Sequence, residues 1–352
     1  TGAITINNAL AINLQVQDGD AVVASVAGNQ ATTLNITAVE DLFITATLPN
    51  LETINASGVA GLFKATISDN DFDLVTGPNA DITITGSNLL STASIDGSAG
   101  TLNLTIGTAS DLSAGTLISV ETLKIVSGQS VTLSAAQVAA IGEADISGVA
   151  GGSSETLNIN GLTGAITINE ALLGTGVVLG TVTMAAGTHT LTAGTDLTGA
   201  SLLVPAGSTL TLTADQYMAL ADLDGIAPVA PATAQAVIHI TGLTQDHIDA
   251  GFSLARVSNV NVALSDVALD PAATTVNLVN DASGTVAVSD ATNLNGFGVV
   301  LSANQTLGLA NSVQADGLRI AGDSTNTVVF RFDALDTATT TGATADSRID
   351  AS

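Results

Sequence analysis

The sequence contains no cysteine, no tryptophan, a single tyrosine and two methionines in 352 residues. The absence of cysteine excludes a disulfide framework. Aromatic residues make up 2 % of the chain and apolar residues 46 %, so any core is built from Ala, Val, Ile and Leu. Such small aliphatic side chains suit a thin, regularly stacked core better than a bulky globular one.

Basic residues are also scarce. Six Lys and Arg stand against 32 Asp and Glu, which gives a formal net charge of −26. Nucleic acid is excluded as a partner, because neutralising phosphates requires Lys and Arg. Self-repulsion on this scale is expected to be countered by cations, and Ca²⁺ is the first candidate. No run of about 18 or more apolar residues occurs, so no transmembrane helix is expected.

The chain repeats itself. Residues 1–10, TGAITINNAL, return at 163–172 as TGAITINEAL, identical at nine positions of ten. The tripeptide Gly-Leu-Thr at 161–163 returns at 242–244, an offset of 242 − 161 = 81 residues, which is half of the first offset, 163 − 1 = 162. Self-similarity at a fixed period is typical of solenoids and tandem arrays.

Four repeat units are expected, at 1–80, 81–162, 163–243 and, in divergent form, 244–336, followed by a polar linker or tail at 337–352. Because residue 1 lies inside a repeat motif, the chain is expected to be a segment of a longer polypeptide or a product trimmed at its N-terminus. A strand like 157–162 is then expected before Thr1, in the same chain or from a neighbouring subunit. Deleting 1–7 should therefore impair assembly more than the fold of later units.

Short runs of alternating apolar and polar residues recur about every ten residues between Gly, Asn and Asp turns, which is typical of all-β folds. A short helix is predicted over 134–141, where Ser134 can cap it and Ala dominates, and the segment beginning TADQYMALAD at 213 repeats it. Strands are predicted at 3–7, 11–17, 21–26, 32–37, 41–46, 51–54, 62–68, 101–106 and 122–126.

Two architectures fit these patterns. The favoured one is an all-β, repetitive parallel β-solenoid (β-helix) with short Ala-rich helical turns, in which a unit holds about four coils of roughly twenty residues. The alternative is a row of tandem antiparallel Ig-like β-sandwich domains, since units of about 80 to 100 residues also suit that fold. A sandwich usually needs large core residues such as Trp or Tyr, which this chain almost lacks, so the solenoid is preferred.

The first candidate metal site is the run DNDFD, in which Asp69, Asp71 and Asp73 alternate. Alternate carboxylates of an extended segment can converge on a hard cation such as Ca²⁺. The run departs from an EF-hand loop, because Leu74 stands where Gly is required. Asp18 and Asp20 form a second acidic turn. The alternative interpretation of both is that they are solvated turn residues.

No catalytic site is predicted. The histidines His189, His239 and His247 occupy different positions within the units, and no GxSxG elbow, P-loop or dinucleotide fingerprint occurs. A Ser-His-Asp arrangement assembled in space is left open by the sequence. The chain is predicted not to be an enzyme and to hold no cofactor other than Ca²⁺.

The segments SAAQVAAIGEADISG (134–148) and TADQYMALADLDG (213–225), set among Thr-, Ala-, Gly- and Asn-rich strands, resemble the β-strand-repeat exoproteins of Gram-negative bacteria. That group includes surface-layer proteins, secreted calcium-dependent repeat proteins and large adhesins. The resemblance implies an extracellular or cell-surface protein that assembles with itself, commonly with Ca²⁺. No functional residue carries over, because the group's GGxGxD calcium motif is missing.

The expected function is that of a structural extracellular protein that self-assembles into a surface layer, sheath or filament. Its partners would be further copies of itself, with cell-surface polysaccharide as a second candidate. One alternative is the stalk or spacer of a bacterial adhesin. A polysaccharide-active β-helix enzyme is a third, but it needs clustered carboxylates and aromatic side chains for sugar stacking, and Tyr217 alone is poor material for that.

Overall fold

The computed structural model contains two compact units, the first made of Thr1–Leu162 and Ile168–Thr181 and the second of Thr163–Thr167 and Val182–Ser352. Strand β18 (Val177–Met184) begins in the first unit and ends in the second. The structure describes residues 2–27, 30–46, 52–68, 71–86, 89, 91–98, 100–149, 154–226, 235–252, 254, 256–258, 260–265, 285–288, 298–300, 306–310, 319–321 and 327–331.

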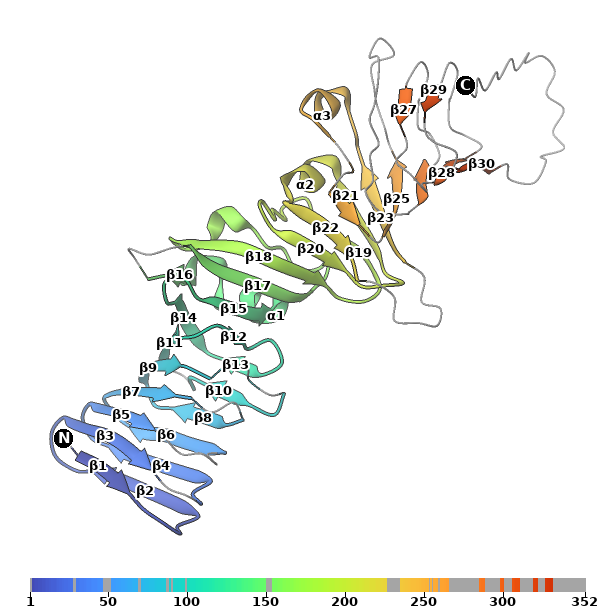
Figure 1. Ribbon diagram of the computed structural model, residues 1–352. Helices are drawn as coiled ribbons and strands as arrows, with labels where there is room; N and C mark the ends of the chain where they lie inside the picture. The colour runs from blue at the N-terminus through green and yellow to red at the C-terminus, as the bar shows by residue number, and fades with distance from the viewer. Residues whose placement is uncertain are drawn as a thin grey trace, which may run out of the picture. The chain divides into compact units, whose positions relative to one another are not determined.

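Unit 1 is a parallel β-solenoid. Its strands alternate between two sheets, ordered β1-β3-β5-β7-β9-β11-β14-β16 and β13-β10-β8-β6-β4-β2, so the chain coils from one sheet to the other and back (Figure 1). The first sheet consists of β1 (Gly2–Thr5), β3 (Ala21–Ala27), β5 (Leu42–Ala46), β7 (Leu62–Ile67), β9 (Asn79–Ile84), β11 (Thr101–Ile106), β14 (Val120–Ile125) and β16 (Ile146–Gly148). The second consists of β2 (Ala11–Val16), β4 (Thr33–Ala38), β6 (Thr53–Val59), β8 (Asp73–Thr76), β10 (Ser94–Asp96) and β13 (Thr116–Ile118).

Later coils of unit 1 add a third row of strands and the first helices. Strands β12 (Ser110–Asp111), β15 (Ser130–Ser134) and β17 (Glu155–Leu162) pair in that order. Helix α1 (Ala135–Ile141) follows β15 directly, and two short 3₁₀ helices lie at Glu143–Asp145 and Glu170–Leu172.

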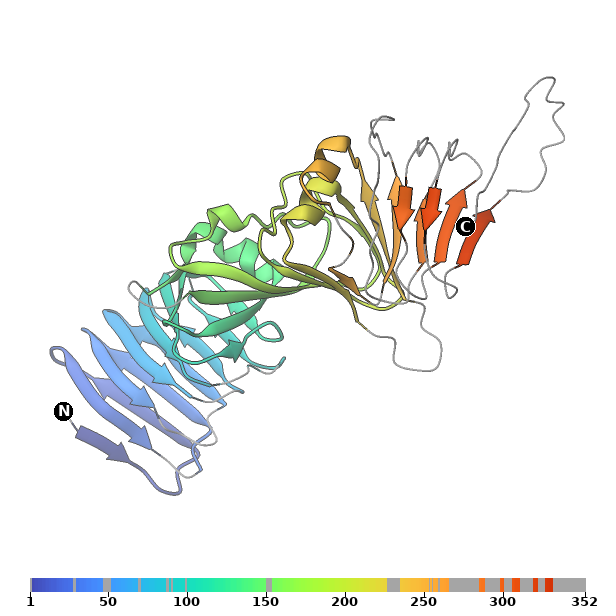
Figure 2. The same cartoon turned by 45° about the horizontal axis from the view of Figure 1, so that its top comes forward.

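Unit 2 continues the same construction with parallel strands (Figure 2). One row contains β20 (Ser201–Val204), β22 (Asp222–Gly225) and β24 (Val257–Ser258). Another contains β19 (Thr188–Thr190), β21 (Thr209–Thr213), β23 (Ala236–Thr241), β25 (Val260–Ser265), β26 (Thr285–Val288), β28 (Thr306–Ala310) and β30 (Thr327–Arg331), and β27 (Gly298–Val300) pairs with β29 (Arg319–Ala321). Helices α2 (Ala214–Ala219) and α3 (Gln245–Asp249) follow β21 and β23.

The coil length and the core agree with the sequence prediction. Ile12 pairs with Leu34 and Leu34 with Ile54, so one coil takes 22 residues and the next 20. All three side chains are at most 3 % exposed, as expected for alternate residues of a strand that faces an aliphatic interior. Every strand pairing described is parallel. The solenoid is confirmed, and the antiparallel sandwich is wrong.

Outward positions carry ladders of polar side chains between neighbouring coils. The amide Nδ2 of Asn35 donates to Oδ1 of Asn13 at 2.9 Å, and Asn103 Nδ2 donates to Asp81 Oδ1 at 2.8 Å. The Thr122 hydroxyl then donates to Asn103 Oδ1 at 2.7 Å. These residues stack because the coils keep register, which explains why the outer face favours Asn, Thr and Asp.

The helices repeat one design. Ser134 caps α1 in a capping box with Gln137, as the sequence predicted for 134–141. The Gln137 amide also donates to the carbonyls of Leu112 and Gly115 in the preceding coil, both at 2.9 Å. In α2, Thr213 and Gln216 form the same box, and Gln216 donates to the carbonyls of the preceding coil at Thr192 and Thr195. One glutamine thus both caps a helix and ties it to the coil before it.

The two copies of the opening decapeptide differ in structure. Gly2–Thr5 forms strand β1, whereas the equivalent residues after Thr163 form turns. In the second copy the amide of Ile166 donates to the Thr163 carbonyl, and Gly164 packs so closely on the Thr190 carbonyl that a Cβ would not fit. The same decapeptide therefore forms a strand at its start in the first copy and turns in the second.

Candidate functional site

The structure locates four of the five predicted metal ligands and leaves Asp69 outside the described residues. Asp71 and Asp73 are exposed at the start of β8, and Asp71 Oδ1 accepts a hydrogen bond from the Thr92 hydroxyl at 2.6 Å. Asp18 and Asp20 are exposed in the turn between β2 and β3. No group of three or more His, Asp or Glu side chains gathers among the described residues. Calcium binding by these aspartates therefore stays a prediction.

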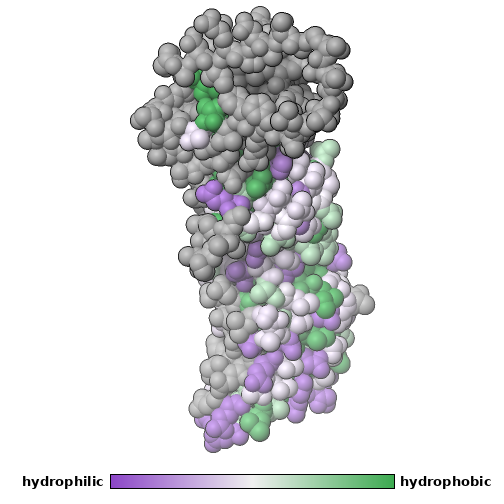
Figure 3. Space-filling view, turned by 90° about the vertical axis from the view of Figure 1, so that its right-hand side faces the viewer, coloured by the Kyte–Doolittle hydropathy of each residue, from purple (hydrophilic) through white to green (hydrophobic). Residues whose placement is uncertain are grey.

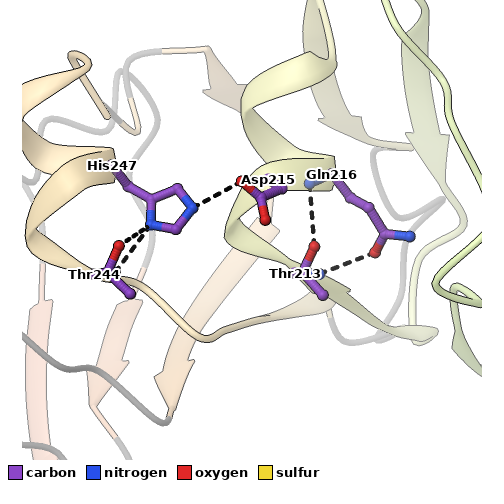
Figure 4. A network of polar contacts seen from close by, with 5 residues as sticks. All are labelled: Thr213, Asp215, Gln216, Thr244 and His247. Atoms are coloured by element: carbon purple, nitrogen blue, oxygen red, sulfur yellow. Dashed lines mark hydrogen bonds and ion pairs between the residues drawn. The ribbon is translucent and has the colours of Figure 1, made fainter.

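The most elaborate polar cluster lies in unit 2, where α2 and α3 are side by side (Figure 4). Nε2 of His247 in α3 lies 3.0 Å from Oδ1 of Asp215 in α2. Nδ1 of the same ring lies 2.6 Å from Oγ1 of Thr244 and 3.0 Å from its backbone nitrogen. The His247 side chain is 14 % exposed and that of Asp215 is 88 % exposed.

These contacts define the tautomer of His247 in this arrangement. The backbone N–H of Thr244 donates to Nδ1, so Nδ1 carries no proton. The proton of the neutral ring then lies on Nε2, which donates to Asp215. The Thr244 hydroxyl, 2.6 Å from Nδ1, shares the single lone pair of that nitrogen with the backbone N–H.

The Thr244 hydroxyl contacts the His247 imidazole, which contacts the Asp215 carboxylate, and this order of groups is also that of a nucleophilic triad. Here Nδ1 of the imidazole accepts the backbone N–H of Thr244, which is one of the two hydrogen bonds of a capping box. His247 stands three residues after Thr244, as Gln137 and Gln216 stand three residues after their capping Ser134 and Thr213. We interpret the cluster as half of a capping box, in which His247 takes the place of Gln and also bonds to the neighbouring helix through Asp215.

Beside this cluster lies the one described aromatic ring pair. The rings of Tyr217 and Phe252 have centroids 5.3 Å apart, and the Arg256 guanidinium carbon lies 5.3 Å from the Tyr217 centroid. Arg256 also donates to the Leu220 carbonyl at the end of α2. Burial raises the pKa of Tyr217 to about 12, against the opposing effect of the Arg256 charge and hydrogen bond.

Two carboxylates of β22 influence each other. Burial, followed by the negative charge of Asp222 and a hydrogen bond to it, raises the pKa of the Asp224 carboxyl. Both side chains alternate with Leu223, whose side chain is fully buried. The negative charge of Asp222 thus disfavours the ionised form of Asp224.

The other histidines are isolated from this cluster in the strands. His189 lies in β19, with Nε2 3.3 Å from the Ala186 carbonyl oxygen. His239 lies in β23, next to Thr211 and Ala263 in the neighbouring strands. None of the described helices is long and apolar enough to cross a membrane.

Sequence reasoning missed the contact of α3 with α2. The signal that could have shown it is the spacing Thr-x-x-His at 244–247, which copies Ser-x-x-Gln and Thr-x-x-Gln of the two earlier helices.

Comparisons of the chain with protein-family models, with curated proteins and with solved structures find no match. The β-solenoid is therefore established by the geometry of the chain itself.

Proposed function

We propose that this chain is a structural extracellular protein that assembles with copies of itself into a surface layer, sheath or filament. The observation that supports this best is the repetition of small polar and acidic side chains on the outer face of the solenoid. One row runs through consecutive coils of the six-stranded sheet as Thr33, Thr53, Asp73, Ser94 and Thr116. A surface that repeats from coil to coil offers the same contact many times, as lateral assembly requires.

The outer surface is better suited to polar contacts between copies than to a hydrophobic interface. Hydrophilic, intermediate and hydrophobic residues are interspersed on the described part of the face in Figure 3. Large exposed apolar side chains occur on separate elements, for example Val22 on β3, Val39 after β4 and Ile118 on β13. Single exposed apolar residues of this kind do not mark an interface.

Charge makes such contacts depend on cations. With a formal charge of −26, two copies repel each other unless counterions lie between them. Exposed carboxylates such as Asp18, Asp20, Asp71 and Asp73 supply oxygen ligands that Ca²⁺ could share between copies. This agrees with the resemblance to bacterial β-strand-repeat exoproteins, and it supports the proposal of a location outside the cell, where Ca²⁺ is abundant.

The test is the state of the purified chain with and without Ca²⁺. After dialysis against a chelator we expect a monomer by light scattering, and after addition of millimolar Ca²⁺ we expect ordered sheets or filaments by negative-stain microscopy. Mg²⁺ at the same concentration is the control for ionic strength. A chain that stays monomeric across Ca²⁺ and protein concentration would contradict the proposal.

Two other outcomes point to the alternatives. Particles of fixed length with no lateral order would favour the stalk of an adhesin. Turnover of acidic polysaccharides in a substrate screen would favour a β-helix enzyme and would overturn a purely structural role.

A further inference from the structure

Glu155 is the one acidic or basic side chain that is buried among the residues whose exposure the structure describes. It is the first residue of β17 and is 2 % exposed. Its inward direction follows from strand alternation, since Leu157 and Ile159, two and four residues on, are fully or almost fully buried in the core. The strand alternation therefore places a carboxyl group on the inner side of the strand, in line with the aliphatic side chains of Leu157 and Ile159.

Glycines make room for this side chain. A Cβ at Gly148, the last residue of β16, would collide with Oε2 of Glu155, and a Cβ at Gly176 would lie 2.8 Å from the same atom. Two backbone hydrogen bonds hold the surrounding chain. The Gly148 N–H donates to the Thr175 carbonyl at 2.9 Å, and the Glu155 N–H donates to the Gly176 carbonyl at 3.0 Å. We call Gly148, Glu155, Thr175 and Gly176 the glycine niche.

One oxygen of the carboxylate lacks a hydrogen-bond partner among the described protein groups. Among the described residues, Oε1 of Glu155 is buried and accepts no hydrogen bond, and no Lys, Arg or His lies within ion-pair distance. A carboxylate oxygen that leaves water without gaining a hydrogen-bond or cation partner is in an unfavourable environment. A cation at this place would supply the partner that Oε1 lacks.

We propose that the glycine niche binds one Ca²⁺ ion through the Glu155 carboxylate. Oxygen is the donor that the niche offers, and Ca²⁺ accepts carboxylates and backbone carbonyls in flexible geometry, whereas Mg²⁺ demands a near-ideal octahedron. The carbonyl oxygens of Thr175 and Gly176 each keep a second lone pair beyond any one hydrogen bond. Thr175 and Gly176 are exposed, so an ion reaches the niche from solvent.

This site differs in kind from cation bridges between exposed aspartates. All four residues of the niche belong to unit 1, so the ion would join successive segments of one chain and stabilise the fold of a single copy. Ca²⁺ binding at this site is measured on the monomer. The result therefore supports or contradicts the proposed site whether or not the chain assembles.

The test compares the full-length wild type with Glu155→Gln, which keeps the shape of the side chain and removes its charge. The matched control is Glu121→Gln, at an exposed position of β14. Each protein is dialysed against a chelator, titrated with Ca²⁺ by calorimetry and heated with and without Ca²⁺. We expect the wild type and Glu121→Gln to bind one more ion than Glu155→Gln, and to gain about 5 °C or more in Tm at 100-fold saturation.

The rival occupant is a proton on the carboxyl group. In that case Glu155→Gln would bind as many ions as the wild type and would match or exceed its Tm in both conditions. The infrared band of a neutral carboxylic acid would then be present in wild type loaded with Ca²⁺ and absent from Glu155→Gln. Either result overturns the proposal.

Should Glu155→Gln fail to fold by circular dichroism, Glu155→Asp serves in its place. It retains the charge but withdraws the carboxylate by one methylene, so we expect Ca²⁺ affinity at this site to fall at least tenfold. Unchanged affinity of a folded Glu155→Asp would show that the ion binds elsewhere.

Discussion

Nε2 of His247 lies 3.0 Å from Oδ1 of Asp215, and this contact joins two short helices of neighbouring coils in unit 2. The other nitrogen of the ring accepts the backbone N–H of Thr244. One imidazole thus performs two tasks that the glutamines of α1 and α2 also perform, which are to cap a helix and to bind the neighbouring coil.

We expect His247→Ala to destabilise unit 2 by about 1 kcal/mol, because a side chain that caps a helix is lost. His247→Gln should restore most of that loss, since Gln occupies the same position in α1 and α2. Asp215→Asn should cost less than about 1 kcal/mol, because the pair is largely exposed on the aspartate side. Thermal unfolding of the three variants tests this, and equal losses for Ala and Gln would contradict the capping role.

Gln137→Ala should be more costly, at about 2 to 4 kcal/mol, because it removes a cap and leaves the carbonyls of Leu112 and Gly115 without their amide donor. Hydrogen exchange is the sharper measurement, since loss of protection should begin in α1 and in the turn near Leu112. Gln15→Ala on the exposed face of β2 is the control. If both variants lose amide protection alike, the hydrogen bonds from Gln137 to the preceding coil contribute little to stability.

Because Tyr217 is buried, we expect the folded chain to lose stability at alkaline pH. Its pKa is raised by burial to about 12, so between the unfolded value of 10.0 and 12 the unfolded chain loses a proton that the folded chain keeps. The contribution of Tyr217 to stability is complete below pH 10.0 and is lost as the pH rises through about 12. The full effect is about 2 to 3 kcal/mol.

Because the chain has a single tyrosine, the ultraviolet absorbance of tyrosinate reports this residue alone. We expect its midpoint near pH 12 in the folded protein and near 10.0 in denaturant. Tyr217→Phe should remove this part of the alkaline instability. A folded midpoint at the unfolded value would show that the phenol is not buried.

The interaction of Asp222 with Asp224 predicts that a neutral substitution at Asp222 changes stability at one pH and not at another. The raised pKa of Asp224 means that its contribution to stability is present below the unfolded pKa of 3.8 and is lost as the pH rises through the folded value. Asp222→Asn removes the repelling charge, so it should raise the Tm at pH 7 and leave it nearly unchanged at pH 3. A lower Tm at pH 7 would indicate that Asp222 contributes more through its hydrogen bonds than it costs by repulsion.

Much of the fold could be predicted because local pattern and tertiary context agree. The spacing of Ile12 and Leu14 within one strand, and the recurrence of such strands at coil intervals, leave few architectures open. Helix α1 was predictable from Ser134 and its alanines. Where context disagrees, the pattern fails: the decapeptide at 163–172 forms turns and a 3₁₀ helix, although the start of its first copy forms β1.

The candidate sites were less predictable, because burial of a polar residue depends on register. Glu155 follows Gly and Ser residues and looks like a loop residue by composition, but the alternation with Leu157 and Ile159 assigns it to the inner face. His247 required recognition that histidine can replace glutamine in a capping box. The exposed aspartates give no such signal, since carboxylates on turns are common with or without a cation.

Each coil pairs only with the coil before it and the coil after it, 20 to 22 residues away along the six-stranded sheet of unit 1. The number of coils can consequently differ without a change in this architecture. Gain or loss of a whole coil leaves every remaining strand with a neighbour of the same kind, whereas a change of a few residues shifts the register and turns core side chains outward. Evolution can therefore lengthen such a protein by duplication without redesigning its core.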